Sequence, residues 1–135
     1  MIVGVGLDQV EIARVARMVE RHGARALDRL FTEGEQAYAM RRGEPARHLA
    51  ARFAAKEAGY KALQGDDGAR AIGWRDIEVV SAPDGRPSLQ LHGLAAAVAA
   101  RLGVTRAWVS LTHDVHTAAA VVVVEAGVVT ADPGA

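Results

Sequence analysis

Residues 46–63 read ARHLAARFAAKEAGYKAL and form the longest stretch of helical periodicity in the chain. The stretch is rich in alanine and leucine and contains a single glycine, Gly59, so we predict one long helix. It also holds both lysines of the chain, Lys56 and Lys61, which flank Glu57, whereas arginine occurs fourteen times. Coding bias and chance would explain this concentration, and so would a site that requires an ammonium group.

The segments on either side of this helix predict an α+β fold. We predict strands at 1–7, 77–80, 88–91, 108–112 and 118–124, and helices at 10–22, 32–42, 46–63 and 93–102, with 24–31 as a further short helical segment. Thr32 and Glu35 have the spacing of a capping box at the start of one helix. The main order is strand, three helices, two strands, helix, two strands. This order suits a largely antiparallel sheet packed on the long helix, and the last strand, apolar on both faces, is expected to be central.

Length and composition predict one domain without thiol chemistry. The chain has 135 residues, half of them apolar, which is enough for a single core, and we place the domain at 1–126 with a disordered tail at 127–135. There is no cysteine, so disulfides and thiolate metal sites are excluded.

Charge and hydropathy restrict the partners. Sixteen basic and sixteen acidic side chains cancel, which does not support a generally basic surface for nucleic acid. The start, MIVGVGLDQV, has no cationic leader and no cleavage pattern, and the apolar runs are shorter than a membrane span. We therefore expect a cytoplasmic protein that does not bind a membrane.

Three side chains could together bind a metal ion and a phosphate. Glu57 and Lys61 lie one helical turn apart and could contact one ligand, although a surface ion pair is the simpler explanation. Asp8 follows the apolar strand, where it could enter a cleft or cap the next helix. If Asp8 met Glu57, the two carboxylates would repel unless a cation lay between them, and hard oxygen ligands favour Mg²⁺. Two acids, one metal ion and one ammonium suit phosphoryl transfer.

Two further groups of residues have both a structural and a functional interpretation. His113 ends a predicted strand, where it could be a structural hydrogen bonder or contact phosphate, with Asp114 fixing its tautomer; a zinc site would need a third ligand that the sequence does not provide. Arg14, Arg17 and Arg21 share a helix face. They could form an ordinary solvated surface or bind an acidic protein through carboxylate contacts.

Five segments in the same order resemble the holo-acyl-carrier-protein synthases, the small bacterial class of 4′-phosphopantetheinyl transferases. The resemblance extends from Ile2 to Glu125. Its most specific segments are GVGLDQVEIARV at 4–15, ARFAAKEAGYKAL at 51–63, WRDIEV at 74–79, GRPSLQLHG at 85–93 and VSLTHDVHTAAAVVVVE at 109–125. One such segment alone would be weak, whereas five in order are specific.

The resemblance implies a fold, a reaction and a catalytic centre. The fold would be that of the 4′-phosphopantetheinyl transferases. Coenzyme A would donate its phosphopantetheine arm to a serine of acyl carrier protein and release adenosine 3′,5′-bisphosphate. Asp8 and Glu57 would hold Mg²⁺, Lys61 would neutralise charge on the phosphoryl or leaving group, and Glu57, directly or through water, would accept the serine proton. Gln9 and Val10 offer no further carboxylate, so water would complete the metal shell.

The resemblance also assigns the binding residues and an assembly. Thr112 and His113 would line the pyrophosphate or 3′-phosphate site, and His113 would belong to the catalytic set. Arg52 and the turn Gly85, Arg86 and Pro87 would lie near the nucleotide, and Arg14, Arg17 and Arg21 would receive the acidic helix of the carrier protein. A homotrimer with active sites at subunit interfaces is implied. The alternative is a non-catalytic adaptor that binds an acidic protein through its arginine-rich helix.

Overall fold

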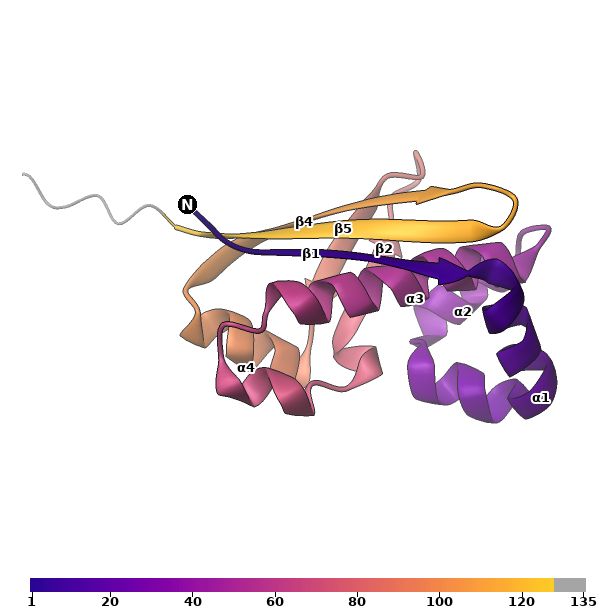
Figure 1. The fold of residues 1–135 in the computed structure, drawn as a ribbon, viewed down its shortest axis with the longest axis horizontal. Helices are drawn as coiled ribbons and strands as arrows, with labels where there is room; N and C mark the ends of the chain where they lie inside the picture. Colours follow the sequence, from indigo (N-terminus) through magenta and orange to yellow (C-terminus); the bar gives the residue numbers. More distant parts are fainter. Residues whose placement is uncertain (128–135) are drawn as a thin grey trace, which may run out of the picture.

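In the computed structural model, which describes residues 1–127, a layer of strands lies on a layer of helices (Figure 1). The strands are β1 (Ile2–Glu11), β2 (Ile77–Ser81), β3 (Pro87–Leu91), β4 (Val104–His113) and β5 (Thr117–Ala126). The helices are α1 (Ile12–Leu30), α2 (Glu33–Met40), α3 (Pro45–Ala62) and α4 (Gly93–Arg101), with short 3₁₀ helices at Asp67–Ala71 and Trp74–Asp76.

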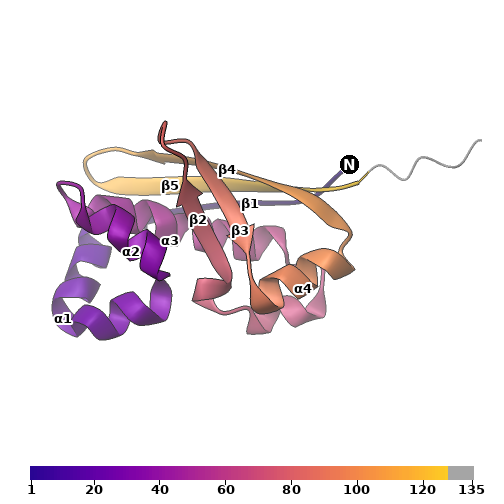
Figure 2. The same ribbon diagram turned by 180° about the vertical axis from the view of Figure 1, so that it is seen from behind.

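The strands form two antiparallel sheets. The larger has the order β1-β5-β4, and β2 and β3 form a separate hairpin, which crosses the long strands obliquely (Figure 2). The predicted α+β order and the central position of the last strand are therefore confirmed. Of the predicted tail at 127–135, all but Gly127 lies outside the described residues.

The first strand is longer than predicted, and this changes the place of Asp8. Pairing with β5 continues through the whole strand as far as Glu11 opposite Thr117, so cross-strand hydrogen bonds extend β1 over residues for which the sequence pattern predicts a turn and a helix. Asp8 therefore lies inside β1 rather than at its end. The residue that precedes α1 is Glu11, without a side-chain cap, so the interpretation of Asp8 as a helix cap is wrong.

Two local predictions about the helices are confirmed. Gly23 adopts φ 54° and ψ −136° and interrupts α1 where the sequence predicts a boundary between two helical segments. At the start of α2, the Glu35 amide donates to the Thr32 hydroxyl at 3.2 Å, and the Thr32 amide donates to the Glu35 carboxylate at 2.9 Å, so the capping box is formed.

Helix α3 runs beneath the larger sheet and forms the centre of the core. Its alanines Ala50, Ala54, Ala55 and Ala58 are fully buried. Because alanine side chains are small, they allow the helix backbone to approach the sheet closely. Alternate residues of β5 complete this core: Ala118, Ala120, Val122 and Val124.

The closest approach is between α3 and β1, where glycine is required. A Cβ atom on Gly4 would lie 1.9 Å from the carbonyl oxygen of Ala62, and one on Gly6 would lie 1.7 Å from that of Ala58. Both distances are far shorter than any van der Waals contact, so the two backbones touch. Asp8 is the next residue on the same face of β1 and is therefore held against the helix.

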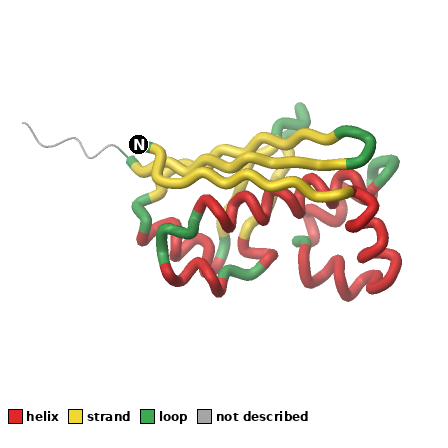
Figure 3. The backbone as a smooth tube through the Cα atoms, viewed as in Figure 1, coloured by secondary structure: helices red, strands yellow, loops and turns green. Residues whose placement is uncertain are grey.

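The opposite face of the larger sheet, here called the outer face, carries exposed apolar side chains. The described helices all lie on the other side of the sheet (Figure 3). On the outer face, Val5 and Leu7 are 58% and 66% exposed, and Trp108 of β4 is 51% exposed. Their neighbours on β5 are Val121 and Val123, which are half-buried. Of the described helices, none is long and apolar enough to cross a membrane.

The backbone contact between α3 and β1 predicts the effect of a single methyl group. Gly6→Ala would place that methyl against the Ala58 carbonyl, so the free energy of unfolding should fall by at least about 3 kcal/mol. Gly43→Ala is the matched control, since no atom lies within 4 Å of the position that its added methyl group would take, and it should change stability by less than about 0.5 kcal/mol. Urea unfolding of both variants measures the difference, and equal stabilities would refute the close contact.

Candidate active site

Three of the predicted site residues lie together where α3 meets β1, and we call them the carboxylate cluster: Asp8, Glu57 and Lys61. The Lys61 ammonium lies 3.4 Å from the Asp8 carboxylate and donates to the Leu7 carbonyl at 3.1 Å. Among the described residues, the ion pair of Lys61 is with Asp8 rather than with Glu57, so the simpler helix pair anticipated from the sequence is not what this lysine forms. Asp8 and Glu57 of one chain lie within electrostatic range of each other, since the Asp8 carboxylate raises the pKa of Glu57.

The pKa of the Glu57 carboxyl is affected by burial and by three charged side chains nearby. Burial raises the pKa of the Glu57 carboxyl, and the nearby Asp8 carboxylate raises it further. Lys61 and Arg14 oppose this shift and lower the pKa. Arg14 comes from α1, so the first residue of the predicted carrier-binding helix face also lies within electrostatic range of the cluster.

The carboxylate cluster fits a hard divalent cation. Its two acids supply oxygen ligands only, and they repel each other, which a cation between them would relieve. Within residues 1–127 there is no group of three or more His, Cys, Asp or Glu side chains arranged to hold a metal ion. Two carboxylates are nevertheless sufficient for Mg²⁺, which usually keeps several waters and is completed by substrate phosphates.

A pocket of about 430 Å³ begins beside Glu57. One wall is α3, through Glu57 and Tyr60, and the other is the segment 72–77. Trp74 in that segment stacks on Phe53 of α3, with ring centroids 5.2 Å apart. The full lining is Lys56, Glu57, Tyr60, Arg70, Ile72, Gly73, Trp74 and Ile77. The pocket thus offers a space of mixed polar and apolar lining beside Glu57.

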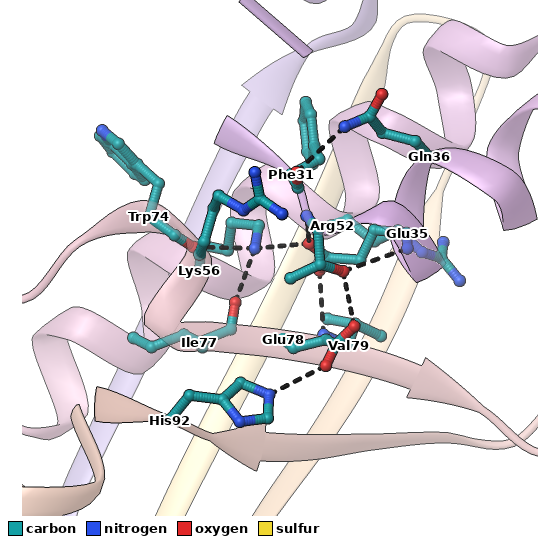
Figure 4. Close-up of polar contacts among 12 residues, drawn as sticks. Phe31, Glu35, Gln36, Arg52, Lys56, Trp74, Ile77, Glu78, Val79 and His92 are labelled. Atoms are coloured by element: carbon teal, nitrogen blue, oxygen red, sulfur yellow. Dashed lines mark hydrogen bonds and ion pairs between the residues drawn. The ribbon is translucent and has the colours of Figure 1, made fainter. Parts of the chain in front are cut away.

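A buried ion pair that the sequence did not reveal lies behind this pocket. The Lys56 ammonium lies 2.7 Å from the Glu35 carboxylate and donates to the carbonyls of Trp74 at 2.9 Å and Ile77 at 2.6 Å (Figure 4). Glu35 also accepts from the Val79 amide at 2.9 Å. Burial lowers the pKa of Lys56, and Glu35 opposes the change. The spacing of Thr32 and Glu35 signalled the cap, but no local pattern pointed to a partner on α3.

A second group of predicted residues gathers around the first half of α3 and the β2–β3 hairpin. Arg52 is 3% exposed, and its guanidinium lies over the Tyr38 ring at 3.9 Å and donates to the Ser81 hydroxyl at 2.9 Å. Ser81 pairs with Pro87 across the hairpin, so Arg52 lies at the base of the predicted nucleotide turn. In that turn Gly85 and Arg86 are exposed, and Arg86 pairs with Asp84 at 3.1 Å.

His113 belongs to this second group, whereas Thr112 points away from it. The two are consecutive in β4, and their side chains therefore face opposite sides of the sheet. His113 is paired with the buried Ala118 on the helix side, and Thr112 lies on the outer face. Burial lowers the pKa of His48 on α3, and Arg52, Arg47, Arg42 and His113 lower it further. The basic side chains around His48 are here called the cationic cluster: Arg42, Arg47, Arg52 and His113.

The proposed orienting role of Asp114 toward His113 has no support among the described hydrogen bonds. The Asp114 carboxylate accepts from the amides of His116 at 2.8 Å and Thr117 at 2.7 Å, and so holds the turn between β4 and β5.

The two clusters are separated along α3. His48 and Glu57 are nine positions apart in the sequence, which corresponds to a rise of about 13 Å along the helix axis. No single phosphate could contact both from one chain. The remaining predicted residues, Arg14, Arg17 and Arg21, are exposed on α1, and the last two line one hollow with Glu20.

Comparisons with known proteins identify the family. A family model described as the 4′-phosphopantetheinyl transferase superfamily matches residues 4–121. A holo-[acyl-carrier-protein] synthase of Methylobacterium radiotolerans is 49% identical over 130 residues, covering 93% of this chain and 95% of that protein. The acyl carrier protein synthase of Mycobacterium tuberculosis is 44% identical, with a TM-score of 0.72, and the match covers 94% of this chain and all of that one (100%).

A third relative was solved with a ligand. The holo-(acyl-carrier-protein) synthase of Bacillus anthracis, in complex with CoA (3′,5′-ADP), is 30% identical with a TM-score of 0.74, and the match covers 94% of this chain and 99% of that one.

The raised pKa of Glu57 predicts a pH-dependent effect on stability. The folded protein binds a proton at this carboxyl more readily than the unfolded chain, so this group stabilises the fold at low pH. That contribution is lost as the pH rises through the folded pKa. Without divalent ions, Glu57→Gln should therefore have a higher Tm than the parent at about pH 7, and the difference should shrink toward about pH 4.

Adding Mg²⁺ gives the second part of this test. The ion should raise the Tm of the parent protein by binding the folded state and should leave Glu57→Gln nearly unchanged. Calorimetry with and without a chelator measures both effects. An equal Mg²⁺-dependent rise in the two proteins, or a lower metal-free Tm for Glu57→Gln, would contradict the assignment.

Proposed function

The chain belongs to the 4′-phosphopantetheinyl transferase superfamily, and from this premise we propose how it acts. It transfers the 4′-phosphopantetheine group of coenzyme A to a serine of apo acyl carrier protein and releases adenosine 3′,5′-bisphosphate. The activity is that of a holo-[acyl-carrier-protein] synthase. The observation that carries the mechanism is the carboxylate cluster of two acids and an ammonium, of which Glu57 also lines a pocket.

The acids of this cluster would hold the divalent ion that the reaction requires. We assign the metal to Asp8 and Glu57, because they are two carboxylates within electrostatic range of each other and Glu57 lines the pocket. When bound, Mg²⁺ supplies positive charge that neutralises the pyrophosphate. Lys61 lies beside them with its side chain about half exposed, so its ammonium can contact a phosphoryl oxygen. Positioning and charge neutralisation are what phosphoryl transfer chiefly needs.

The proton of the serine must leave as the new bond forms. The serine oxygen attacks the phosphorus that bears the pantetheine arm, and the bond from that phosphorus to the oxygen bridging to the nucleotide breaks. Glu57 would accept the proton, directly or through a water, because it is the carboxylate that lines the pocket beside the reacting group. The leaving adenosine 3′,5′-bisphosphate keeps the bridging oxygen.

The pocket beside Glu57 would take the pantetheine arm. The arm is joined to the reacting phosphorus, so it must leave the carboxylate cluster in a direction that the protein leaves open. The pocket is lined by Glu57, Tyr60 and the segment 72–77, and its mixture of apolar and hydrogen-bonding side chains suits an uncharged chain that contains amide groups.

The arginines of α1 are suited to bind the carrier protein. Arg14, Arg17 and Arg21 are exposed on one helix face, and Arg14 is near enough to Glu57 to lower its pKa. An acidic protein docked there would bring its serine to the carboxylate cluster.

We further propose a homotrimer in which each site is completed by a neighbouring protomer. The outer face exposes Val5, Leu7 and Trp108, which is the kind of apolar surface that a subunit interface covers. Within one chain the cationic cluster and the carboxylate cluster are too far apart to grip the same phosphate. In this trimer, coenzyme A would be held by the acids of one protomer and by Arg52, the turn Gly85 to Pro87, and His113 of the next.

A non-catalytic adaptor remains the second candidate, since the exposed arginines alone could bind an acidic protein. One assay separates the two functions. The protein is incubated with coenzyme A and apo acyl carrier protein, with Mg²⁺ or with a chelator, and the products are examined by mass spectrometry. We expect a phosphopantetheine mass gain on the carrier and free adenosine 3′,5′-bisphosphate, both abolished by the chelator and by Asp8→Asn. No gain with several apo carriers would refute the transferase function.

Mixed trimers test whether the site is shared. Asp8→Ala and His113→Ala should each be inactive alone, but random co-assembly of equal amounts should restore about one quarter of the parent activity, because a quarter of the interfaces then combine two intact halves. Mixing Asp8→Ala with Glu57→Ala is the matched control and should restore nothing, since both changes affect the same half. Absence of recovery in the first mixture would mean that each protomer forms its own site.

A further inference from the structure

We infer that Lys56 is a positioning residue for the transfer reaction: neutralised by Glu35, it fixes the segment 72–77 to α3 and thereby sets the width of the pocket that holds the pantetheine arm. The inference rests on the proposed function, since it concerns the arm of coenzyme A. It gives the two lysines of the chain different roles, although both flank Glu57.

The hydrogen bonds of Lys56 leave its ammonium no donor for a substrate, although the side chain is part of the pocket lining. An ammonium group has three N–H donors, and all three of Lys56 have partners: the Glu35 carboxylate, the Trp74 carbonyl and the Ile77 carbonyl. The residue is 1% exposed. No donor is left for a phosphate, in contrast to the half-exposed Lys61.

The two carbonyls are placed at the ends of one short turn. Trp74 opens the 3₁₀ helix Trp74–Asp76, and Ile77 is the first residue of β2. By bonding to both, the ammonium holds the whole turn against α3 (Figure 4). Among the described side chains of α3, Lys56 is the one that hydrogen-bonds to this segment, while the stacking of Phe53 on Trp74 adds an apolar contact.

Glu35 neutralises the buried charge of Lys56 and binds β2 one step further along the chain. Its carboxylate accepts from the amide of Val79, two residues further along β2, as well as from Thr32 at the start of α2. Removing one charge of a buried pair leaves the other without compensation and is strongly destabilising, whereas removing both is often nearly neutral. The position of the segment can therefore be changed without a buried unpaired charge only by altering both residues.

The pocket wall is affected directly because the same residues line it. Trp74 and Ile77 form one side of the pocket, and Glu57 and Tyr60 form the other. Releasing the turn changes the space for the arm, whereas the contact of Arg52 with Ser81 and the place of His113 on β4 do not involve Lys56. Loss of Lys56 should therefore weaken binding of coenzyme A while sparing adenosine 3′,5′-bisphosphate, which lacks the arm.

The experiment compares the two ligands on Lys56→Met and on the double variant Lys56→Met/Glu35→Gln. For the double variant we expect the Kd of coenzyme A, measured by calorimetry, to rise about tenfold and the Kd of adenosine 3′,5′-bisphosphate to change less than about twofold. Steady-state kinetics should show a raised KM for coenzyme A with kcat within about twofold of the parent. A merely structural role would weaken both ligands together.

Arg101→Met is the matched control. Arg101 pairs with Asp66 at 2.9 Å at the other end of the connection between α3 and β2, and neither residue lines the pocket. For Arg101→Met, the ratio of the Kd of coenzyme A to the Kd of adenosine 3′,5′-bisphosphate should equal that of the parent. A double variant that binds coenzyme A like the parent, or that weakens both ligands equally, would overturn the inference.

A measurement on the unaltered protein decides the matter if both variants fail to fold. Coenzyme A should slow hydrogen exchange at the amides of segment 72–77 more than adenosine 3′,5′-bisphosphate does, and equal slowing would overturn the inference. Failure of the proposed function is distinguishable, because the parent protein would then transfer nothing to the carrier while these binding ratios could still be measured.

Discussion

The rest of the structure depends on the direct contact between the backbones of β1 and α3. Gly4 and Gly6 have no side chain, so the helix carbonyls of Ala58 and Ala62 can occupy the space where a Cβ atom would lie. This contact brings Asp8, the next residue on that face, beside the helical turn that carries Glu57 and Lys61. Two carboxylates that repel each other are thereby held by the fold itself, and this unfavourable arrangement is the one a divalent cation would stabilise.

The two lysines illustrate how burial decides the role of the same functional group. Lys61 is half exposed and keeps a donor for a ligand, whereas all donors of the fully buried Lys56 are used within the protein. An ammonium is suited to both tasks because it presents its donors in three directions from one point. Arginine, with its planar fork, suits the flat contact with Tyr38 that Arg52 makes.

Much of the fold was predictable because it follows from local signals. The periodicity of 46–63, the capping box at Thr32 and the apolar last strand predicted α3, the start of α2 and the central β5, and all three are confirmed. The end of β1 was not predictable, because pairing with a strand more than a hundred residues later determines it. The Glu35–Lys56 pair escaped prediction for the same reason. From the residues alone, the convergence of Asp8 and Glu57 was only a condition for a metal site, and the family resemblance implied it. The separation of His113 from them depends on the order of the strands.

The central claim is that Asp8 and Glu57 together hold the metal ion on which the transfer depends. The most direct measurement is a crystal structure of the protein with coenzyme A and Mg²⁺. The account predicts one Mg²⁺ with an oxygen of each carboxylate at about 2.1 Å and with the pyrophosphate completing its shell. A metal ion bound without Asp8 and Glu57, or a pyrophosphate bound away from them, would contradict it.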